Sequence, residues 1–464
     1  MNYLRHYAKA QRPVETCVIG SGGFGRSFLA QSLRMPLVNA RIAMDLDTDT
    51  ARQALLSVGI PSEQIAVVTS RAEAQAAWQQ GHYLAIRDLT LVLDLPIDLV
   101  IEATGNPEAG ARHARLAIEA NCHVALASKE VDSVIGPELS RLARERGRVV
   151  TPVDGDQPAL LIGLITWAQT LGFEVLAAGK ASEYDFVFDA STGKMSSNGV
   201  TVDIPDFAAH WQLAGRATQE IALARSQSCG VLPQRAVPDL CELQVVANST
   251  GFLADTPGLH APIARIPEVP EFFALREEGG MLAARQTLDV FHCLRAPGEI
   301  SFAGGVFVII RCNDKETWEL LTGKGHVVSL DGSRAMVFIP RHLLGLEAAT
   351  SVLDAVVHGA SSGAEAPRPV LDLVARATEP LKAGSVLQMG GHHHSISGLA
   401  SELVPAAALA AGVPAPFYLV SNRRLVRDVA AGALICFDDI AIDADSELLR
   451  LRLQQDRAFF GPRV

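Results

Sequence analysis

The stretch TCVIGSGGFG at positions 16–25 decides the fold class of the N-terminal part of the chain. An apolar run of strand length leads directly into the Gly-rich turn, and apolar residues at helical spacing follow it. In this context G-x-G-x-x-G indicates a dinucleotide site, because the glycines permit a tight turn, a close backbone approach to a pyrophosphate and packing of helix on strand. The alternative is a turn that merely joins a strand to a helix. The residues predicted to contact a dinucleotide are Gly20, Gly22, Gly23, Phe24 and Gly25.

An acidic residue, Asp45, ends the next apolar run. A carboxylate at this position accepts hydrogen bonds from the ribose hydroxyls of NAD and repels the 2′-phosphate of NADP. Asp47 and Asp49 are alternatives for this role, or caps of the following helix, and Arg52 is long enough to reach a phosphate. Taken alone, Asp45 favours NAD.

Apolar runs of strand length alternate with helical patterns from residue 15 to residue 179, which predicts a doubly wound, mainly parallel α/β sheet. Continuous apolar runs are typical of strands that are covered on both faces. The expected strands are Thr16–Gly20, Ala40–Asp45, Leu99–Glu102, His123–Ala127 and Val149–Pro152. The expected helices are Phe24–Arg34, Asp49–Val58, Pro107–Ala120 and Gly136–Arg146, with Pro107 and Pro137 in first turns.

Length, composition and charge limit the classes of protein that fit. The 464 residues are 48% apolar and 20% charged, which suggests two or three packed domains at ~150 residues per domain. The formal net charge of −11 disfavours a nucleic-acid or membrane-surface partner, because it repels phosphate groups. The segment Met1–Pro13 lacks the apolar core of a secretory signal, and acidic residues interrupt the most apolar stretch, Leu89–Ala103. Seven scattered cysteines without a Cys-x-x-Cys pair fit reduced thiols, so we expect a cytoplasmic protein.

A second, sheet-containing domain is expected after Lys180. The polar run Ser191–Asn198 is too irregular to predict as a strand and suggests a mobile or substrate-covering insert. Strand patterns return at Gly305–Arg311 and at Val327–Ile339, where Asp331-Gly332 predicts a hairpin turn. A last helix, Leu343–Val357, precedes a stretch of Ala, Ser, Gly and Pro at 359–369, which indicates a domain boundary near residue 365.

The C-terminal part contains an internal pseudo-repeat, Ala377–Gly384 and Leu425–Gly432, which predicts a compact β module. His392-His393-His394 suggests a metal site, but three consecutive side chains cannot all face one ion. A polar loop is the favoured interpretation, and no metal site is predicted.

Polar residues follow the ends of several predicted strands. Thr104, Gly105 and Asn106 lie at the sheet edge where such folds bind ligands, so we expect them to line the nicotinamide half of the cofactor site. The alternative is a Pro-started helix with a Thr or Asn cap.

Lys129 follows the next strand, and a lysine beside a nicotinamide can bind a carbonyl or alkoxide oxygen where charge develops. A surface salt bridge is the alternative. In Asp154-Gly155-Asp156 we expect one carboxylate to cap a helix and the other to face the cleft. Lys180 would be the second cation of the site if the run before it is the strand that leads into the next domain. These residues make Lys129, Lys180 and Asp156 the candidates for catalysis.

Two polar positions are weaker candidates for substrate contact. Asn248, within Asn248–Gly251, follows an apolar run and more often marks the end of a helix. Arg341 can pair with an anionic substrate, although an arginine at an element boundary is more commonly solvated.

The combined motifs resemble the homoserine-dehydrogenase-like oxidoreductases that carry a C-terminal SAF domain. This group includes the DXR-like reductoisomerases, which convert 1-deoxy-D-xylulose 5-phosphate to 2-C-methyl-D-erythritol 4-phosphate with NADPH. The resemblance implies NADP as the cofactor and places Asp156, Gln157, Lys180, Asn248 and Arg341 around the substrate. The chain departs from the reductoisomerase pattern between Ser182 and Asp239. The motifs that carry the resemblance are Gly20–Gly25, Glu102–Pro107, Gly155–Leu160, Ala178–Lys180, Val246–Asn248 and the closing module.

Together these observations predict an NAD(P)-binding Rossmann domain at 1–155, an α+β substrate and dimerisation domain at 156–360, and a small β-rich SAF-like module at 361–464. The expected function is NAD(P)-dependent hydride transfer, with or without isomerisation, at a CH–OH group of a small polyol, sugar acid or sugar phosphate. The alternatives are a deoxyxylulose-phosphate reductoisomerase-like enzyme of isoprenoid precursor synthesis, a homoserine dehydrogenase, and a non-catalytic NAD(P)-sensing assembly protein. A small-molecule substrate and a homodimer or higher homo-oligomer are expected.

Overall fold

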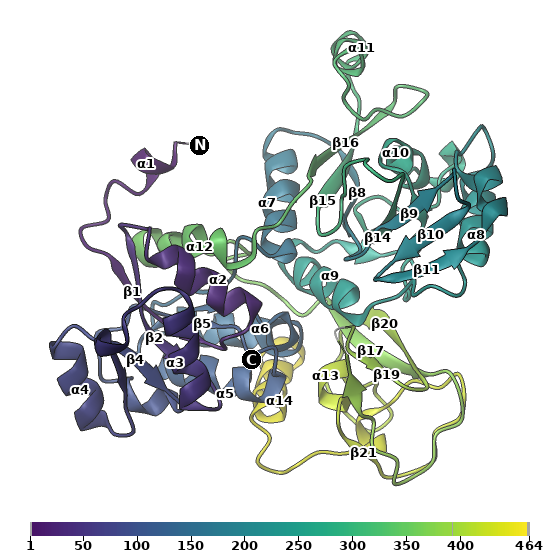
Figure 1. Cartoon of the computed structure of the whole chain (residues 1–464). Helices are drawn as coiled ribbons and strands as arrows, with labels where there is room; N and C mark the ends of the chain where they lie inside the picture. Colours follow the sequence, from purple (N-terminus) through teal and green to yellow (C-terminus); the bar gives the residue numbers. More distant parts are fainter. Residues whose placement is uncertain (1, 392, 462–464) are drawn as a thin grey trace.

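The computed structural model describes residues 2–391 and 393–461, which form three parts in Figure 1. The N-terminal part (purple and blue) contains a parallel sheet, the central part (teal) a larger mixed sheet, and the C-terminal part (yellow-green) a small β-rich module. The predicted α/β class is confirmed. His392 of the predicted histidine loop lies outside the described residues. Within the described residues, no helix combines the length and the apolar character that crossing a membrane requires.

Seven parallel strands form the first sheet, in the order β3-β4-β2-β1-β5-β6-β7. Cys17 and Ile19 of β1 enter one hydrophobic cluster and Val18 enters another, so apolar packing covers both faces. The strand order reverses at β1, and such switch points are where doubly wound sheets bind ligands. The strands are β1 (Val14–Ile19), β2 (Val38–Met44), β3 (Ile65–Val67), β4 (Tyr83–Ile86), β5 (Leu99–Glu102), β6 (His123–Leu126) and β7 (Val150–Pro152). The helices are α2 (Gly23–Ser32), α3 (Thr48–Ser57), α4 (Arg71–Gln79), α5 (Pro107–Glu119) and α6 (Lys129–Arg144).

The predicted strands and most of the predicted helices of this sheet are confirmed, but α6 begins at Lys129 and not at Gly136. Pro137 therefore lies inside the helix, so its prediction as a first-turn residue is wrong. A proline inside a helix leaves the carbonyl four residues before it without a donor. That carbonyl belongs to Ser133, and it accepts a hydrogen bond from Gln244 Nε2 at 2.6 Å instead. A tertiary contact thus permits a helix that the local sequence disfavours.

The central part is built on a nine-stranded mixed sheet. Its main path runs β11-β10-β9-β14-β8-β15-β16, and β12 and β13 both pair with β14. The strands are β8 (Val175–Ala181), β9 (Phe186–Asp189), β10 (Lys194–Ser197), β11 (Val200–Asp203), β12 (Leu253–Ala254), β13 (Ile263–Ala264), β14 (Thr287–Arg295), β15 (Val306–Arg311) and β16 (Arg334–Ile339). The helices are α7 (Gln157–Thr170), α8 (Thr218–Ser228), α9 (Val237–Thr250), α10 (Val269–Phe272) and α11 (Lys315–Gly323), which stands away from the rest in Figure 1.

Of two predictions for the central part, one is wrong and one is confirmed. The run 191–198 contains strand β10, which pairs with β9 and β11, so the prediction of an irregular insert is wrong. Backbone pairing with β9 and β11 and two buried side chains, Met195 and Ser197, are sufficient to hold β10 despite its polar composition. The turn at Asp331-Gly332 is confirmed, because Val328 pairs with Ala335 across it.

The segment after β16 returns to the N-terminal part. It is a 3₁₀ turn (Leu344–Leu346), helix α12 (Ala349–Leu353) and a π-helical turn (Asp354–His358), where the sequence predicts one helix, Leu343–Val357. Val352 and Ala355 share a hydrophobic cluster with β1 and α2. The short N-terminal helix α1 (Tyr3–His6) also contacts this segment, because His6 Nε2 lies 2.9 Å from Asp354 Oδ1.

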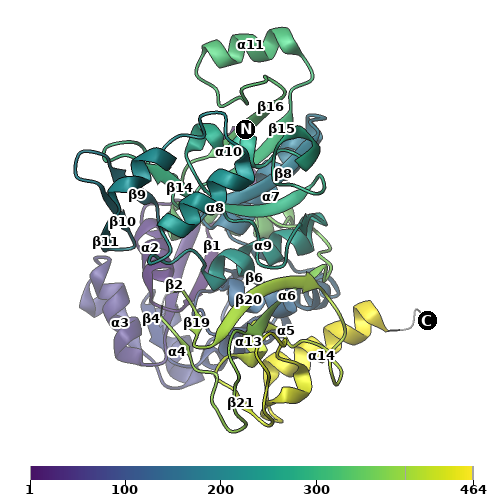
Figure 2. The same ribbon diagram turned by 90° about the vertical axis from the view of Figure 1, so that its right-hand side faces the viewer.

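The C-terminal module is a small set of antiparallel pairings. The two copies of the pseudo-repeat pair with each other, since Leu381 and Val429 exchange backbone hydrogen bonds. A final helix packs on α5 and α6 of the N-terminal part (Figure 2). The elements are β17 (Leu371–Ala377), β18 (Met389–Gly390), β19 (Ser395–Ile396), β20 (Leu399–Pro405), α13 (Phe417–Val420), β21 (Arg424–Leu425), β22 (Ile440–Ala441) and α14 (Glu447–Phe460).

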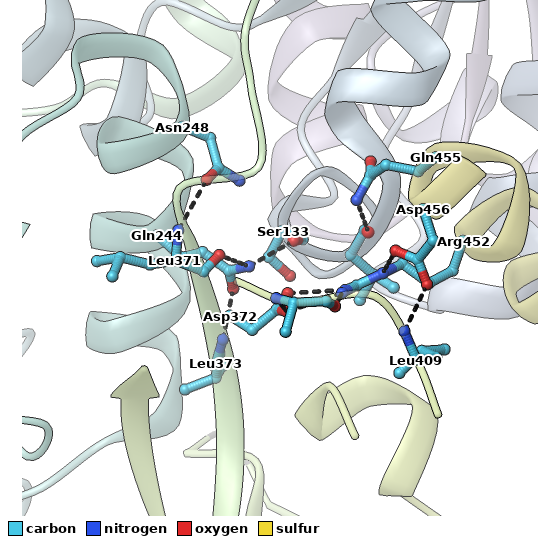
Figure 3. Close-up of polar contacts among 12 residues, drawn as sticks. Ser133, Gln244, Asn248, Leu371, Asp372, Leu373, Leu409, Arg452, Gln455 and Asp456 are labelled. Carbon is cyan, nitrogen blue, oxygen red and sulfur yellow. Dashed lines mark hydrogen bonds and ion pairs between the residues drawn. The ribbon is translucent and has the colours of Figure 1, made fainter. Parts of the chain in front are cut away.

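Buried polar contacts fix this module to the rest of the chain (Figure 3). Arg452 of α14 is fully buried and donates to both oxygens of Asp372 at 2.7 Å, and to Asp456 at 2.8 Å. Gln455 of α14 donates to the Val134 carbonyl of α6 at 3.2 Å. Three segments that are distant in sequence, α6, β17 and α14, are therefore held together by satisfied polar groups.

Candidate active site

The Gly-rich turn borders a cavity of about 550 Å³ at the carboxyl ends of β1, β2 and β5. Gly20 has φ +95°, and a Cβ there would lie 2.5 Å from the Ala103 carbonyl oxygen. A Cβ on Gly25 would lie 1.9 Å from the carbonyl oxygen of Gly20, so α2 can approach β1 only with glycine here. Gly22 lines the cavity, and a Cβ at this position or at Gly23 would meet no protein atom. The backbone is thus open to a ligand, as the phosphate-binding turn of a dinucleotide fold requires.

Asp45 lies on the wall of the same cavity, in front of the Gly-rich turn. Its Oδ2 accepts a hydrogen bond from Ser21 N at 2.9 Å, and its Oδ1 accepts one from Leu46 N at 2.8 Å. The carboxylate therefore positions the turn and retains lone pairs for a ribose. Asp47 caps α3 through Asp49 N, and Arg52 donates to Ser62, so these alternatives have structural partners.

Thr104, Gly105 and Asn106 lie where this cavity meets a second one. The Thr104 hydroxyl donates to Glu102 Oε1 at 2.6 Å, and Gly105 N donates to Ser128 Oγ at 2.9 Å. Asn106 caps α5, since its Oδ1 accepts from Ala109 N at 3.0 Å, and it also lines the cavity. The capping interpretation and the ligand-contact interpretation thus apply to the same residue.

The second cavity, of about 360 Å³, brings the predicted lysines together. Lys129 begins α6, and Lys180 lies in β8 with only 2% of its surface exposed. The Nζ atoms of both contact Glu242 of α9. Lys180 Nζ also lies 2.8 Å from Asp239 Oδ1, and Lys129 Nζ lies 3.7 Å from Asp156 Oδ1.

The electrostatics of this cluster fix its protonation states. The two lysines lower the pKa of Glu242 to about 2 against the effect of burial. Burial opposes the charged form of Lys180, but Asp239 and Glu242 raise its pKa above the ordinary value. Asp156 and Glu242 likewise raise the pKa of Lys129, again against desolvation. The site therefore presents two ammonium groups held by carboxylates.

The loop before α7 supplies the other predicted substrate residues. Asp156 caps α7, because its Oδ1 accepts from Gln157 N at 3.0 Å, and it also lines the cavity. With its amide nitrogen turned towards Glu242, the Gln157 side chain donates to both carboxylate oxygens, at 2.9 and 3.0 Å. Asp154 points away from the cavity and accepts a hydrogen bond from Thr350 Oγ1 at 2.6 Å.

The structure does not bring Asn248 or Arg341 to the cavity. Asn248 Oδ1 accepts from Val370 N at 2.8 Å, so this side chain joins the end of α9 to the strand β17. This agrees with the predicted helix end, and the position of Asn248 does not support the substrate-binding prediction. The guanidinium of Arg341 is solvated and pairs with Glu347, and its neighbour His342 lines the cavity instead.

Sequence reasoning missed several residues of the site. Asp239 and Glu242 lie one turn apart on α9, at and just beyond the end of the stretch Ser182–Asp239 where the chain departs from the reductoisomerase pattern. Their spacing was a usable signal, since i and i+3 on a helix share a face. Glu130 and His394 also line the cavity, and the latter comes from the C-terminal module.

One group of potential metal ligands lies elsewhere among residues 2–391 and 393–461. The ligand atoms of His6, Asp354 and His358 lie within 4.8 Å of one another. These residues line neither of the two cavities described above.

Comparison with known proteins concerns mainly the central part. Residues 155–221 and 236–348 match a family model described as oxidoreductase DRL, catalytic domain. The matched ranges contain Asp156, Gln157, Lys180, Asp239 and Glu242. This part of the chain is therefore similar to an oxidoreductase catalytic domain. No curated protein matches the chain.

Solved structures are similar at low identity. A biliverdin reductase from Synechocystis sp. PCC 6803, in complex with biliverdin and NADP+, is 20% identical, with a TM-score of 0.22 over 38% of this chain and 48% of that one. This chain thus spans about half the length of that protein. A DOX-P reductoisomerase with fosmidomycin and magnesium is 15% identical over 50% and 57% of the two chains, with a TM-score of 0.30. GenD2 from gentamicin A biosynthesis, in complex with NAD, is 14% identical over 75% and 88%, with a TM-score of 0.34.

Proposed function

We propose that the chain is an NAD(P)-dependent oxidoreductase that transfers a hydride between a nicotinamide and the C–OH or C=O carbon of a small polyol, sugar acid or sugar phosphate. One observation carries the proposal. The cavity beside the Gly-rich turn meets, at Thr104, a second cavity that holds two charged lysines. A dinucleotide that follows the first cavity would present its reactive ring to the second.

The residues of the second cavity suit the oxygen chemistry of such a reaction. A protonated lysine stabilises the negative charge that develops on a carbonyl or alkoxide oxygen. Lys129 and Lys180 both offer this charge and are positioned in advance by Glu242. Asp156 and Gln157 can hold further hydroxyl groups. The cofactor supplies the hydride, and these side chains supply orientation and charge stabilisation.

A second candidate function, a reductoisomerase-like reaction, is supported by the number of cations. Two ammonium groups that meet on one carboxylate can bind the two adjacent oxygens of an α-hydroxyketone. Such a substrate undergoes isomerisation before reduction in the family that the sequence resembles. In this proposal the C-terminal module keeps its resemblance to SAF modules.

The first experiment is a fluorescence titration of the purified protein with NADH and separately with NADPH, followed by the emission of the cofactor. Binding of either one at micromolar concentrations supports the proposal, and binding of neither overturns it. Turnover is then measured with polyols, aldonic acids and their phosphates, through the absorbance of the reduced nicotinamide.

Lys180→Met tests the role assigned to the lysines. We expect turnover to fall about 10²- to 10³-fold, with cofactor affinity unchanged, because the variant removes a charge-stabilising donor but no dinucleotide contact. Lys129→Met is the second variant, since Lys129 is less buried and its loss is easier for the fold to tolerate. Lys382→Met, on the exposed surface of the C-terminal module, is the matched control. Full activity in both site variants would contradict the mechanism.

A further inference from the structure

A loop of the C-terminal module enters the region between the other two parts of the chain. The loop joins β18 to β19, and its described residues include His393 and His394. The His393 carbonyl accepts a hydrogen bond from Val237 N at 3.3 Å, at the start of α9. The His393 Nε2 atom lies 3.0 Å from Asn198 Nδ2, and its ring meets the Tyr184 ring edge-on at 5.4 Å. The loop is therefore seated on the central part, beside the substrate cavity.

His394 itself lines the substrate cavity. Its backbone has φ +53°, a left-handed conformation that costs free energy for a residue with a Cβ. Its Nδ1 lies 3.0 Å from the Tyr418 hydroxyl, and the two rings meet edge-on at 84°. These contacts orient the imidazole so that Nε2 lies 3.9 Å from Glu130 Oε1.

Glu130 is the second member of the pair. It lies in the first turn of α6 beside Lys129, and 5% of its surface is exposed. Burial raises the pKa of Glu130 to about 7, while the nearby Lys129 opposes this rise. The carboxyl group is thus poised to gain or lose a proton near neutral pH, as general acids and bases require.

The neighbouring Lys129, Tyr418 and Cys241 do not share the near-neutral pKa of Glu130. Lys129 is held in its charged form by Asp156 and Glu242. Burial raises the pKa of the Tyr418 hydroxyl and of the Cys241 thiol well above neutral. Charged or titratable groups near the pair include Glu102 on β5, Lys129 on α6, Asp156 at α7, Cys241 and Glu242 on α9, and Tyr418 on α13, and Glu183 and His342 line the same cavity.

The proposed reaction needs a proton as well as a hydride. In the direction of reduction, the carbonyl carbon would receive the hydride that a bound reduced nicotinamide supplies, while the C=O π bond breaks and its electron pair remains on oxygen. That oxygen must then gain a proton, and the reverse direction must remove one. The lysines can stabilise the charge, but they donate a proton poorly, because each is ion-paired with a carboxylate.

We propose that His394, supplied by the C-terminal module, and Glu130, supplied by α6, together hold the proton that passes to or from the substrate oxygen. During reduction, His394 Nε2–H donates its proton to that oxygen, and Glu130 orients the ring and stabilises its charged form. The nicotinamide is oxidised, the substrate is reduced, and the pair is reprotonated from solvent. This inference rests on the proposed function and adds a residue to its active site.

The first test does not depend on the substrate. The imidazole C2–H resonance of His394 is assigned in the full-length protein by its loss in His394→Gln, and then titrated by NMR. We expect Glu130→Gln to lower the titration midpoint of this ring by about one pH unit, because it removes the carboxylate that stabilises the imidazolium. Glu316→Gln, which alters an exposed carboxylate of α11 outside the cavity, is the control and leaves the midpoint unchanged. An unchanged midpoint in Glu130→Gln overturns the pair.

The second test measures turnover with whichever alcohol or carbonyl compound the protein accepts. We expect His394→Gln to lower kcat/KM about 10²-fold and to remove the limb of the pH profile that lies near neutrality, with nicotinamide affinity unchanged. His326→Gln, at an exposed position after α11, is the matched control. A wild-type pH profile and rate in His394→Gln overturn the inference. Failure of the wild-type chain to bind either nicotinamide overturns the proposed function instead, so the two failures are distinguishable.

Discussion

Asp45 illustrates how one residue in this site serves both the fold and a ligand. Its carboxylate accepts hydrogen bonds from Ser21 N of the Gly-rich turn and from Leu46 N. It also lies on the wall of the dinucleotide cavity, together with Arg87 and Arg112. In the proposed function, the preference between NAD and NADP would depend on a balance between the repulsion of a 2′-phosphate by Asp45 and its attraction to an arginine.

Asp45→Asn tests this balance, since it conserves the shape of the side chain and removes its charge. We expect the ratio of the two affinities to shift towards NADPH by about tenfold or more, because a charged acceptor of the ribose hydroxyls is lost and the repulsion of a phosphate ends. The fluorescence titration with NADH and NADPH measures both affinities. Asp49→Asn, on the exposed face of α3, serves as the control and keeps the wild-type ratio. An unchanged ratio in Asp45→Asn would place the discrimination elsewhere.

His292 gives a prediction for stability against pH. The ring is 3% exposed, and burial lowers its pKa to about 4, while its Nε2 lies 3.0 Å from the Gln234 carbonyl oxygen. Between the ordinary histidine pKa near 6.5 and this value, the unfolded chain binds a proton that the folded chain does not. Stability therefore falls as the pH falls through this window, by about 2 kcal/mol between pH 7 and pH 5 for this residue.

Urea unfolding at pH 7 and pH 5 measures this effect. In His292→Gln we expect the loss of stability between the two pH values to shrink by that amount, since glutamine does not titrate. His123, which is also buried with a pKa lowered to about 4, retains its own contribution in the variant. An equal loss in the variant and in the wild type would show that His292 does not remain neutral in the fold.

At the scale of elements, α6 shows how a helix tolerates an internal proline. Pro137 donates no hydrogen bond to the Ser133 carbonyl, and Gln244 of α9 fills that position. Gln244 Nε2 also donates to the Leu371 carbonyl at 2.8 Å, which joins the helix to β17 (Figure 3). The proline therefore creates a docking point between elements of the three parts.

Gln244→Met tests this docking point, because it keeps the length of the side chain and removes the donor. We expect the free energy of unfolding to fall by about 2–4 kcal/mol, since the carbonyl groups of Ser133 and Leu371 lose a donor and Leu373 N loses its acceptor, Gln244 Oε1. In a Pro137→Ala background the fall is smaller, because the alanine N–H can bond to the Ser133 carbonyl. A double-mutant cycle by chemical denaturation measures the difference, and simple additivity of the two changes would contradict this account.

The local sequence predicted five strands of the first sheet and helices between them, but it missed β3, β4 and α4, the start of α6, and strand β10 of the central sheet. The strands of the parallel sheet are continuous apolar runs, so their pattern is legible without tertiary information. Strand β10 is polar and is stabilised by backbone pairing with β9 and β11, which no local pattern records. The start of α6 was misplaced because the proline suggested a first turn, whereas a distant glutamine satisfies the carbonyl that the proline leaves free.

At the scale of the whole molecule, the buried arginine Arg452 connects the last helix to strand β17 of the same C-terminal module. It pairs with Asp372 of β17 and with Asp456 on its own helix, and α14 in turn packs on α5 and α6. The histidine loop belongs to the same module. The position of the loop at the substrate cavity thus depends on contacts far from the cavity.

Arg452→Met leaves two carboxylates buried without a cation, which is expected to lower the free energy of unfolding by about 3–5 kcal/mol. We also expect faster cleavage of the C-terminal module in limited proteolysis. The combined variant Arg452→Met, Asp372→Leu and Asp456→Leu removes the uncompensated charges and is expected to recover most of the stability, as measured by thermal unfolding. A single variant as stable as the wild type would show that the triad does not anchor the module.

The expected homodimer and the cytoplasmic location stay predictions, and light scattering on the purified protein tests the expected homodimer.

The sequence by itself determined the parallel sheet, the Gly-rich turn and the candidates Lys129 and Asp156, because each of these two residues follows a strand whose end lies at one edge of that sheet. Lys180 was predicted from the apolar run that it ends, and it lies inside β8 of the central sheet. Tertiary structure alone decided which groups contact these candidate residues. Glu242 joins Lys129 across 113 positions of sequence, and His394 arrives from another module. Strand and helix patterns are set by neighbours in the chain, whereas the pairing of charges in a cavity is set by how the finished elements pack.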